Sequence, residues 1–188
     1  LMNMETVHVA WDFLKENGLK ALILKSKHKI QGIDDDYDYA EWWNLTKPSE
    51  EELEEQKKKK FDYMPKFSIV IPVYKTPEKF LKEMLDSIVE QTYANWELCI
   101  ADGSPAGESV ENVLKKYAEK DARIRYQVLG ENRGISGNTN AALEMAEGDF
   151  IVLADHDDRL TPNALFECAK KLNENENCDV LYSDEDKL

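Results

Sequence analysis

Three carboxylates lie within four residues, at Asp155, Asp157 and Asp158, and His156 stands between the first two. They follow the apolar run 150–154, which predicts a buried strand that ends just before them. Two carboxylates this close repel each other by about 1 kcal/mol in water and by about 4 kcal/mol at an effective dielectric of 20. A chain tolerates such a cluster either in bulk solvent or around a cation. Mg²⁺ and Mn²⁺ prefer oxygen ligands, so the residue types suit a divalent-cation site.

The spacing of these acids excludes an EF-hand. Counted from Asp155, the sixth position is Leu160 rather than glycine, and the twelfth is Phe166 rather than glutamate. The sequence also contains no Ser/His/Asp set, Cys/His pair or zinc-type spacing. The acid cluster is therefore the main candidate for chemistry.

The elements that must position these acids alternate between strands and helices from residue 67 onward. Strands are predicted at 67–73, 96–101, 123–129, 149–154 and 179–182. Helices are predicted at 80–89, 110–118 and 138–146, and a further helix is predicted to follow Thr161-Pro162. The pairs Thr76-Pro77 and Thr161-Pro162 both resemble a helix start, with threonine as the N-cap and proline at the first helical position. This order predicts an α/β fold, with a Rossmann-like, mainly parallel sheet and helices on both faces. Residues 1–66 are predicted to form a helical N-terminal extension and linker.

Polar residues follow several of the predicted strands at their carboxyl ends. Tyr74 follows the first strand, Asp102-Gly103-Ser104 the second, the acid cluster the fourth, and Ser183–Asp186 the last. The carboxyl ends of parallel strands share one edge, where open α/β sheets bind ligands. The sequence therefore predicts that these segments converge on one crevice.

The composition narrows the classes of partner. The net charge is −14, and residues 67–188 carry 24 acidic and 13 basic side chains, which argues against a nucleic-acid partner. There is no apolar run of 18 residues, and we do not expect the first residues, Leu1–Met4, to belong to a signal peptide. The three cysteines have no metal-type spacing and suit free thiols in a reducing cytoplasm.

A glycine-rich segment, 130–137, precedes one of the predicted helices. It fits neither the dinucleotide fingerprint nor a P-loop. A flexible loop is one interpretation of it. The alternative is a loop tied to its neighbours by the amides of Asn138 and Asn140.

Four of these segments resemble the motifs of family 2 glycosyltransferases. The segments Ile71–Tyr74, Asp102–Ser104, Asn132–Ser136 and Gly148–Asp158 occur in the order and spacing of that family. The resemblance covers about 67–188 and implies the nucleotide-sugar-binding part of a GT-A fold. Asn140 lies in the helix behind the third motif.

The resemblance also implies a role for each matching position. Tyr74 and the residues before it would border the nucleobase, Asp102 would bind the base, and Arg133 would lie beside the base or phosphates. Asp155 would lie near the ribose, and Asp157, with Asp155, would bind Mn²⁺ or Mg²⁺ beside the donor's diphosphate. The nucleotide-sugar site implied in this way consists of Pro72, Val73, Tyr74, Asp102, Arg133, Asn140, Asp155 and His156.

The function implied is the donor-binding portion of an inverting, metal-dependent glycosyltransferase. It would use a UDP- or dTDP-sugar and a glycan or lipid-linked acceptor in cell-surface polysaccharide synthesis. We expect it in the cytoplasm or at the inner face of the membrane. The catalytic base is expected beyond Leu188, which predicts a truncated fold that is inactive alone.

Two alternatives follow from the same residues. One is a non-catalytic module for nucleotide-sugar binding or assembly. The other is a nucleotidyltransferase, which would need a glycine-rich basic loop after the first strand. The segment Val73–Pro77 stands there instead and argues against it.

Overall fold

The computed structural model describes residues 11, 43–44, 47–175 and 177–183. The chain forms two compact units, 1–49 and 50–188, and the second contains the sheet. Most of the helical extension predicted for residues 1–66 lies outside the described residues. Its described helix, α3 (Glu50–Lys58), belongs to the second unit, so the compact unit begins before the change of pattern at Phe67.

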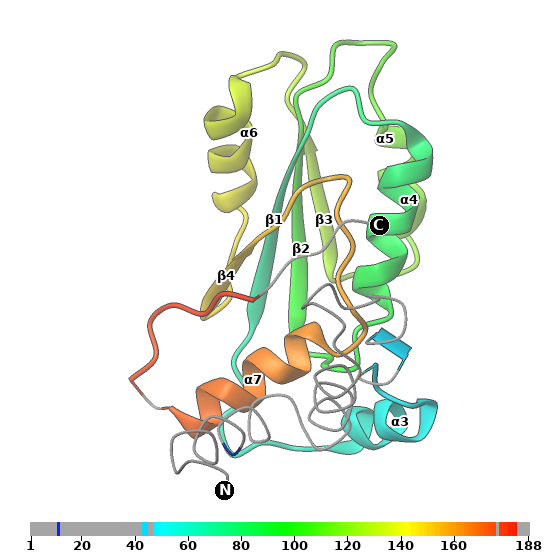
Figure 1. Ribbon diagram of the computed structural model, residues 1–188. Coiled ribbons are helices and arrows are strands. Elements are labelled where there is room, and N and C mark those ends of the chain that lie inside the picture. Colours follow the sequence, from blue (N-terminus) through cyan, green and yellow to red (C-terminus); the bar gives the residue numbers. More distant parts are fainter. Residues whose placement is uncertain (1–10, 12–42, 45–46, 176, 184–188) are drawn as a thin grey trace, which may run out of the picture. The chain divides into compact units, whose positions relative to one another are not determined.

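The described strands form one parallel sheet, which confirms the predicted α/β class (Figure 1). Its strands lie in the order β3-β2-β1-β4. Their bounds are β1 (Phe67–Val73), β2 (Trp96–Asp102), β3 (Ile124–Val128) and β4 (Phe150–Leu153). β1 pairs with β2 along its whole length, but β4 pairs only with Phe67–Val70. The loop after β4 therefore starts about 10 Å below the end of β1.

Helices cover both faces of the sheet (Figure 1). They are α4 (Glu78–Val89), α5 (Glu111–Ala118), α6 (Gly134–Leu143) and α7 (Ala164–Glu174). Because side chains alternate along a strand, Ile69 and Ile71 pack with Leu81 of α4, whereas Val70 packs with Ala141 of α6. The small alanines let α6 lie close to the sheet.

Three details of the helix starts differ from the prediction. α7 has Asn163 at its N-cap position, so Thr161-Pro162 is not its cap. Pro77 occupies the N-cap position of α4, and the buried hydroxyl of Thr76, the expected cap, has no partner among the described residues. α6 begins at Gly134, four residues before the predicted start, because the glycine-rich segment itself supplies the first helical turn.

The strand predicted at 179–182 is wrong. These residues form no ladder, and Val180 and Tyr182 are 80% and 96% exposed. β-branched and aromatic residues favour a strand only where a packed, pleated surface receives their side chains, and here they have none. Among the described residues, no helix is both long and apolar enough to cross a bilayer.

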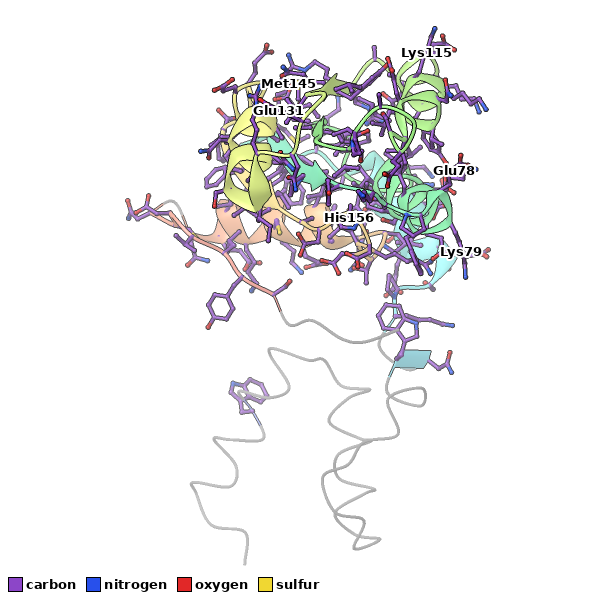
Figure 2. All side chains as sticks on the ribbon, turned by 90° about the horizontal axis from the view of Figure 1, so that it is seen from above. Glu78, Lys79, Lys115, Glu131, Met145 and His156 are labelled. Atoms are coloured by element: carbon purple, nitrogen blue, oxygen red, sulfur yellow. The ribbon has the colours of Figure 1, made fainter. Side chains whose placement is uncertain are left out.

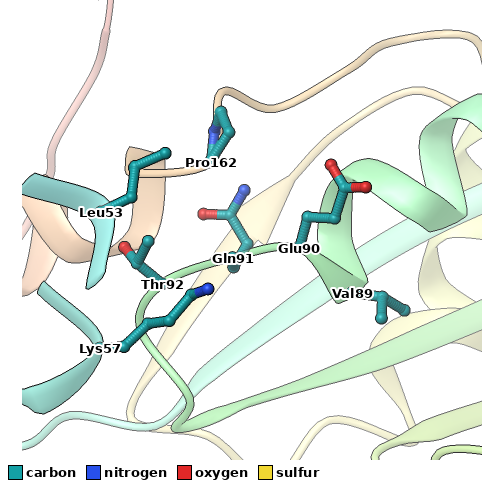
Figure 3. Close-up of a pocket in the computed structure, with 7 residues that line it drawn as sticks. All are labelled: Leu53, Lys57, Val89, Glu90, Gln91, Thr92 and Pro162. Carbon is teal, nitrogen blue, oxygen red and sulfur yellow. The ribbon is translucent and has the colours of Figure 1, made fainter. Parts of the chain in front are cut away.

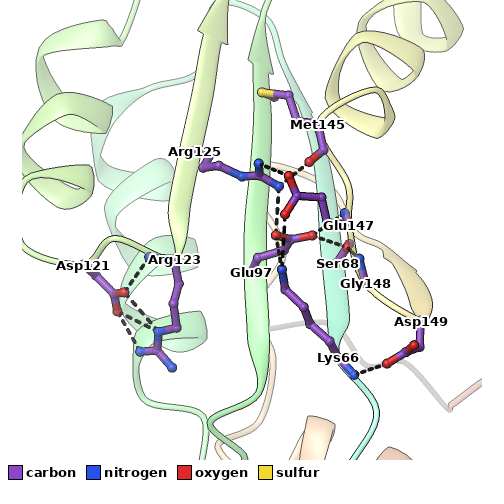
Figure 4. Close-up of polar contacts among 10 residues, drawn as sticks. All are labelled: Lys66, Ser68, Glu97, Asp121, Arg123, Arg125, Met145, Glu147, Gly148 and Asp149. Atoms are coloured by element: carbon purple, nitrogen blue, oxygen red, sulfur yellow. Dashed lines mark hydrogen bonds and ion pairs between the residues drawn. The ribbon is translucent and has the colours of Figure 1, made fainter.

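A buried carboxylate, Glu97, holds the amino end of the sheet together (Figure 4). Its oxygens accept hydrogen bonds from the Ser68 hydroxyl at 2.6 Å and the Glu147 backbone N–H at 2.5 Å. They also form ion pairs with Lys66 at 2.6 Å and Arg125 at 2.8 Å. Glu147 lies in the connection from α6 to β4, so this cluster fixes the strand that leads to the acids.

The same cluster controls the ionisation of Glu97. Burial alone would raise the pKa of its carboxyl, but hydrogen bonds from Lys66, Ser68 and the Glu147 backbone outweigh burial and lower the pKa to about 2. Glu97 is therefore charged at every ordinary pH.

Candidate functional site

The carboxyl ends of the strands carry four loops that differ in how they are held. Seen from above the sheet, His156 lies between the side that carries α6 and the side that carries α4 (Figure 2). Glu131, labelled beside α6, and Glu78, at the start of α4, mark these two sides.

The turn after β1 presents an aromatic ring on a strained backbone. Val73 is fully buried, whereas Tyr74 is 40% exposed. Lys75 adopts φ of 50°, a left-handed conformation that is uncommon for a residue with a side chain. Such strain persists only where the surroundings hold it, and it recurs at binding sites.

The loop after β2 supplies those surroundings. The Ser104 hydroxyl accepts a hydrogen bond from the Lys75 backbone N–H at 2.8 Å, and the Gly103 N–H donates to the Val73 carbonyl at 2.9 Å. The Lys75 ammonium pairs with Glu108 at 3.0 Å, and this contact raises the pKa of the lysine. The first two loops therefore form one unit.

Asp102 folds the loop that follows it. Its side chain is fully buried, and its oxygens accept bonds from the Ser104 N–H at 2.8 Å, the Ser109 hydroxyl at 2.7 Å and the Val110 N–H at 3.2 Å. These three bonds close the loop onto the start of α5. The structure thus brings Asp102 to the predicted edge and directs its carboxylate into its own loop.

The glycine-rich segment after β3 is ordered by a buried asparagine. Asn138 accepts a hydrogen bond from the Arg133 N–H at 3.1 Å and donates to Asn132 at 3.1 Å. Gly130 and Gly134 adopt φ of 72° and 73°, which permits the tight path between them. The sequence predicted that the side-chain amides of Asn138 and Asn140 could tie this segment to its neighbours. The Asn138 amide does so, whereas the Asn140 side chain is exposed.

Arg133 lies on the surface of this segment. Its side chain is exposed and pairs with Glu131 at 3.2 Å. Arg133 is therefore accessible to a ligand at this edge, and Asn140 is exposed further along α6.

Asn138 also packs against the loop after β2. A Cβ at Gly103 would lie 2.6–2.9 Å from the Asn138 amide, so only glycine leaves room for it. The sequence offered both Asn138 and Asn140 as amides that could tie the loops together, and the family resemblance placed only Asn140 in the nucleotide-sugar site. The signal that separates them is helical phase, because Asn138 and the buried Ala141 and Ala142 lie on one face of α6.

The acid cluster lies in the loop after β4. Asp155, Asp157 and Asp158 are exposed and His156 is half-buried. None of the three carboxylates forms an ion pair with a described residue. No three acidic, histidine or cysteine side chains in the described part of the chain form a ready-made metal site.

These acids nevertheless fit a divalent cation that arrives with a ligand. Mg²⁺ keeps several waters and is commonly held by one or two carboxylates together with substrate phosphates. Accessible carboxylates that carry no cationic partner among the described residues suit that arrangement. The donor chemistry is therefore compatible with Mn²⁺ or Mg²⁺.

We expect Gly103→Ala to destabilise the protein by about 1–3 kcal/mol, because the added methyl meets a side chain that cannot move. Urea unfolding measures the loss. The control is the same change in an Asn138→Ala background, where the space is free. The cost of Gly103→Ala should fall there by at least about 1 kcal/mol, and equal costs in the two backgrounds would disprove the packing role.

Comparison with known proteins extends these observations. Residues 68–187 match the family described as Glycosyl transferase family 2. RfbC from Myxococcus xanthus, an O-antigen biosynthesis protein, is 30% identical over 151 residues, which cover 80% of this chain and 12% of RfbC. The chain spans between 12% and 41% of the length of three curated relatives that it matches.

Two solved structures resemble the fold. S. aureus TarS 1–349 in complex with UDP matches with a TM-score of 0.54 and 29% identity, over 59% of this chain and 33% of that one. The mannosyltransferase PcManGT from Pyrobaculum calidifontis, in complex with GDP-Man and Mn²⁺, matches with a TM-score of 0.52 and 26% identity. That match covers 64% of this chain and 37% of PcManGT.

Proposed function

This chain belongs to glycosyl transferase family 2, and from that premise we propose that the carboxyl edge of its sheet binds the donor of a sugar transfer. The GT-A fold predicted from the sequence is confirmed. The donor that we propose is a UDP-sugar. The complete protein would transfer its sugar, with inversion, to a glycan or lipid-linked acceptor of a cell-surface polysaccharide.

One observation carries the proposal: an exposed aromatic ring and an accessible acid cluster lie at the same edge of the sheet. The strands that precede them, β1 and β4, are neighbours in the sheet, and the loop after β2 is bonded to the turn that carries Tyr74. A nucleoside diphosphate needs both an apolar surface for its base and a counter-charge for its phosphates. At this edge, Tyr74 offers the apolar surface for the base. The acids can hold a cation, which would supply the counter-charge for the phosphates.

The base side comprises Pro72, Val73, Tyr74 and the loop of Asp102. We propose that the Tyr74 ring packs against the base, because it is the accessible side chain of this set. Asp102 contributes through the loop it folds, since its carboxylate already accepts three hydrogen bonds. A direct bond from Asp102 to the base would have to reach its buried Oδ1, which accepts one of these three bonds.

The phosphate side comprises the accessible Arg133, Asn140 and the acid cluster. We propose that Asp157, with Asp155, holds Mn²⁺ or Mg²⁺, and that Asp155 and His156 lie near the ribose. A bound divalent cation would neutralise the diphosphate and stabilise it as a leaving group. PcManGT supports this assignment, because its structure was obtained with GDP-Man and Mn²⁺.

The wider role rests on the relatives. TarS binds UDP and, in a second structure, UDP-GlcNAc, which supports a uridine donor. RfbC supports a role in surface polysaccharide synthesis. A cytoplasmic location, in the body of the compartment or at the inner face of the membrane, remains our proposal. No described residue is assigned as the catalytic base.

Calorimetric titration with UDP, GDP and dTDP, each with Mn²⁺ and with EDTA, tests the donor class. We expect UDP to bind at least ten-fold more tightly than GDP with Mn²⁺, and to weaken at least ten-fold in EDTA. A chain that prefers GDP would contradict the uridine assignment. If the affinities for all three nucleotides were the same with Mn²⁺ and with EDTA, the proposed metal-diphosphate site would be contradicted.

A further inference from the structure

Two polar residues interrupt the apolar face of α4. Ser87 lies on the helix, and Gln91 lies just beyond its end at Val89. Each is only 7% exposed, beside the buried Leu85 and Ile88. Burying a polar group is costly unless it is hydrogen-bonded, so the partners of these two side chains indicate why they are there.

Both side chains bind the segment that leads away from the acid cluster. The Gln91 amide donates to the Thr161 carbonyl at 2.7 Å and accepts from the Leu165 N–H at 3.0 Å. The Ser87 hydroxyl accepts from the Leu160 N–H at 3.2 Å. Ser87 and Gln91 therefore hold the backbone at three points within six residues.

Gln91 and Pro162 also line a cavity of about 290 Å³ beside this contact (Figure 3). The Gln91 side chain points toward Pro162, and Thr92 lies beside it. The Thr92 backbone N–H donates to the Pro162 carbonyl at 2.8 Å. The end of α4 and the segment 160–165 therefore form a continuous polar contact.

The acids lie between this contact and the end of β4. On the strand side, the Ala154 N–H lies 3.5 Å from the Val70 carbonyl. In the loop that follows, the Asp158 N–H donates to the Asp155 carbonyl at 3.3 Å, a bond internal to the loop. The place of Asp157 is therefore set by β4 at one end and by α4 at the other.

α4 also begins beside the base side of the site. Its first residue, Glu78, comes four residues after Tyr74. A helix of 12 residues is about 18 Å long and is stiff. One rigid element thus connects the turn that presents the aromatic ring to the segment that carries the acids.

We propose that Ser87 and Gln91 are positioning residues that fix the acid loop at the distance from the base side that a metal-bound diphosphate requires. This inference rests on the proposed function and adds residues far from the strand ends. It predicts that breaking these bonds weakens metal-dependent binding while the base side still works.

The test uses the 188-residue chain and the variant Gln91→Met, which keeps the size of the side chain and removes its hydrogen bonds. We expect UDP affinity with Mn²⁺ to fall about ten-fold, while uridine affinity without metal, measured by NMR titration, stays within two-fold. Tyr117→Phe is the matched control. It removes the 2.6 Å hydrogen bond that the Tyr117 hydroxyl donates to Asp86, on the other side of α4. That variant should change neither affinity.

A second variant, Ser87→Ala, keeps the test decisive if Gln91→Met does not fold. It removes the bond from the Leu160 N–H, together with the bond that the Ser87 hydroxyl donates to the Met84 carbonyl within α4 at 2.7 Å. It should weaken Mn²⁺-dependent UDP binding about three-fold. Variants that bind UDP with Mn²⁺ as the parent does would overturn the inference and leave the proposed function standing. An equal loss of uridine and UDP affinity would mean that Ser87 and Gln91 have only a general structural role. That result would also overturn the inference. A parent chain without metal-dependent UDP binding would overturn the proposed function itself.

Discussion

Asp157→Asn is expected to weaken UDP binding in the presence of Mn²⁺ about 100-fold, or about 2.7 kcal/mol. The change keeps the shape of the side chain and removes the charge that we assign to the metal. In EDTA the order should reverse, because the carboxylate then only repels the diphosphate. The variant should bind metal-free UDP at least as tightly as the parent chain. Calorimetry under the two conditions measures both effects.

Asp158→Asn is the control for this prediction. It makes the same change of charge in the same exposed loop, one residue away. We expect its UDP affinity with Mn²⁺ to fall by less than about three-fold. Equal losses in the two variants would show that the loop acts through its total charge, which would contradict a specific role for Asp157.

Glu97→Gln is expected to reduce the free energy of unfolding by about 3 kcal/mol at neutral pH. The figure follows from the pKa of Glu97, which is about 2 in the folded protein and near 4.5 when unfolded. A glutamine would also turn an N–H group toward Lys66 and Arg125. Urea unfolding measures the loss.

The pH dependence of this effect has a defined sign. A carboxyl whose pKa is lowered by folding stabilises the protein above its unfolded pKa, and that stability disappears as the pH falls toward the folded pKa. The contribution of Glu97 should therefore be complete above about pH 4.5 and be lost toward pH 2. The difference between the parent chain and Glu97→Gln should shrink across that interval.

Glu147→Gln is the matched control, because Glu147 also pairs with Arg125, at 2.9 Å, but is 66% exposed. Exposed ion pairs contribute about 1 kcal/mol or less. If Glu147→Gln costs as much as Glu97→Gln, burial is not what makes the Glu97 contacts strong.

Much of the fold could be predicted from the sequence because its signals are local. The run 67–73 and the helical spacing of Leu81, Leu85 and Ile88 predict elements that the structure contains within one or two residues. The segment 179–182 misled the prediction because its composition suits a strand but its surroundings do not. Whether such a segment pairs depends on a surface formed by distant residues.

Part of the candidate site could also be predicted from the sequence, and part could not. The convergence of Tyr74, Asp102 and the acids followed from one rule about parallel strands, and the structure confirms their common edge. The direction in which the Asp102 carboxylate points could not be predicted, because Ser109 and Val110 reach it through a turn with no clear sequence signal. The contacts of Ser87 and Gln91 join residues 70 or more positions apart, so they leave no local signal in the sequence.

The two edges of the sheet have different tasks in this account. The amino edge holds a permanently charged Glu97 among cations and fixes the connection into β4. Glu97 and Asp102 are five residues apart on β2, or about 16 Å. This separation allows an experiment to distinguish a ligand at one edge from a ligand at the other.

The most direct test of the account is to locate Mn²⁺ by the broadening it causes in backbone amide NMR signals of the chain with UDP bound, with Mg²⁺ as the diamagnetic reference. We expect that the signals of 155–158 disappear, that those of Glu97 and Arg125 are broadened less, and that Asp157→Asn restores the lost signals. Broadening centred on the acidic helix α3, or unchanged signals at 155–158, would contradict the account.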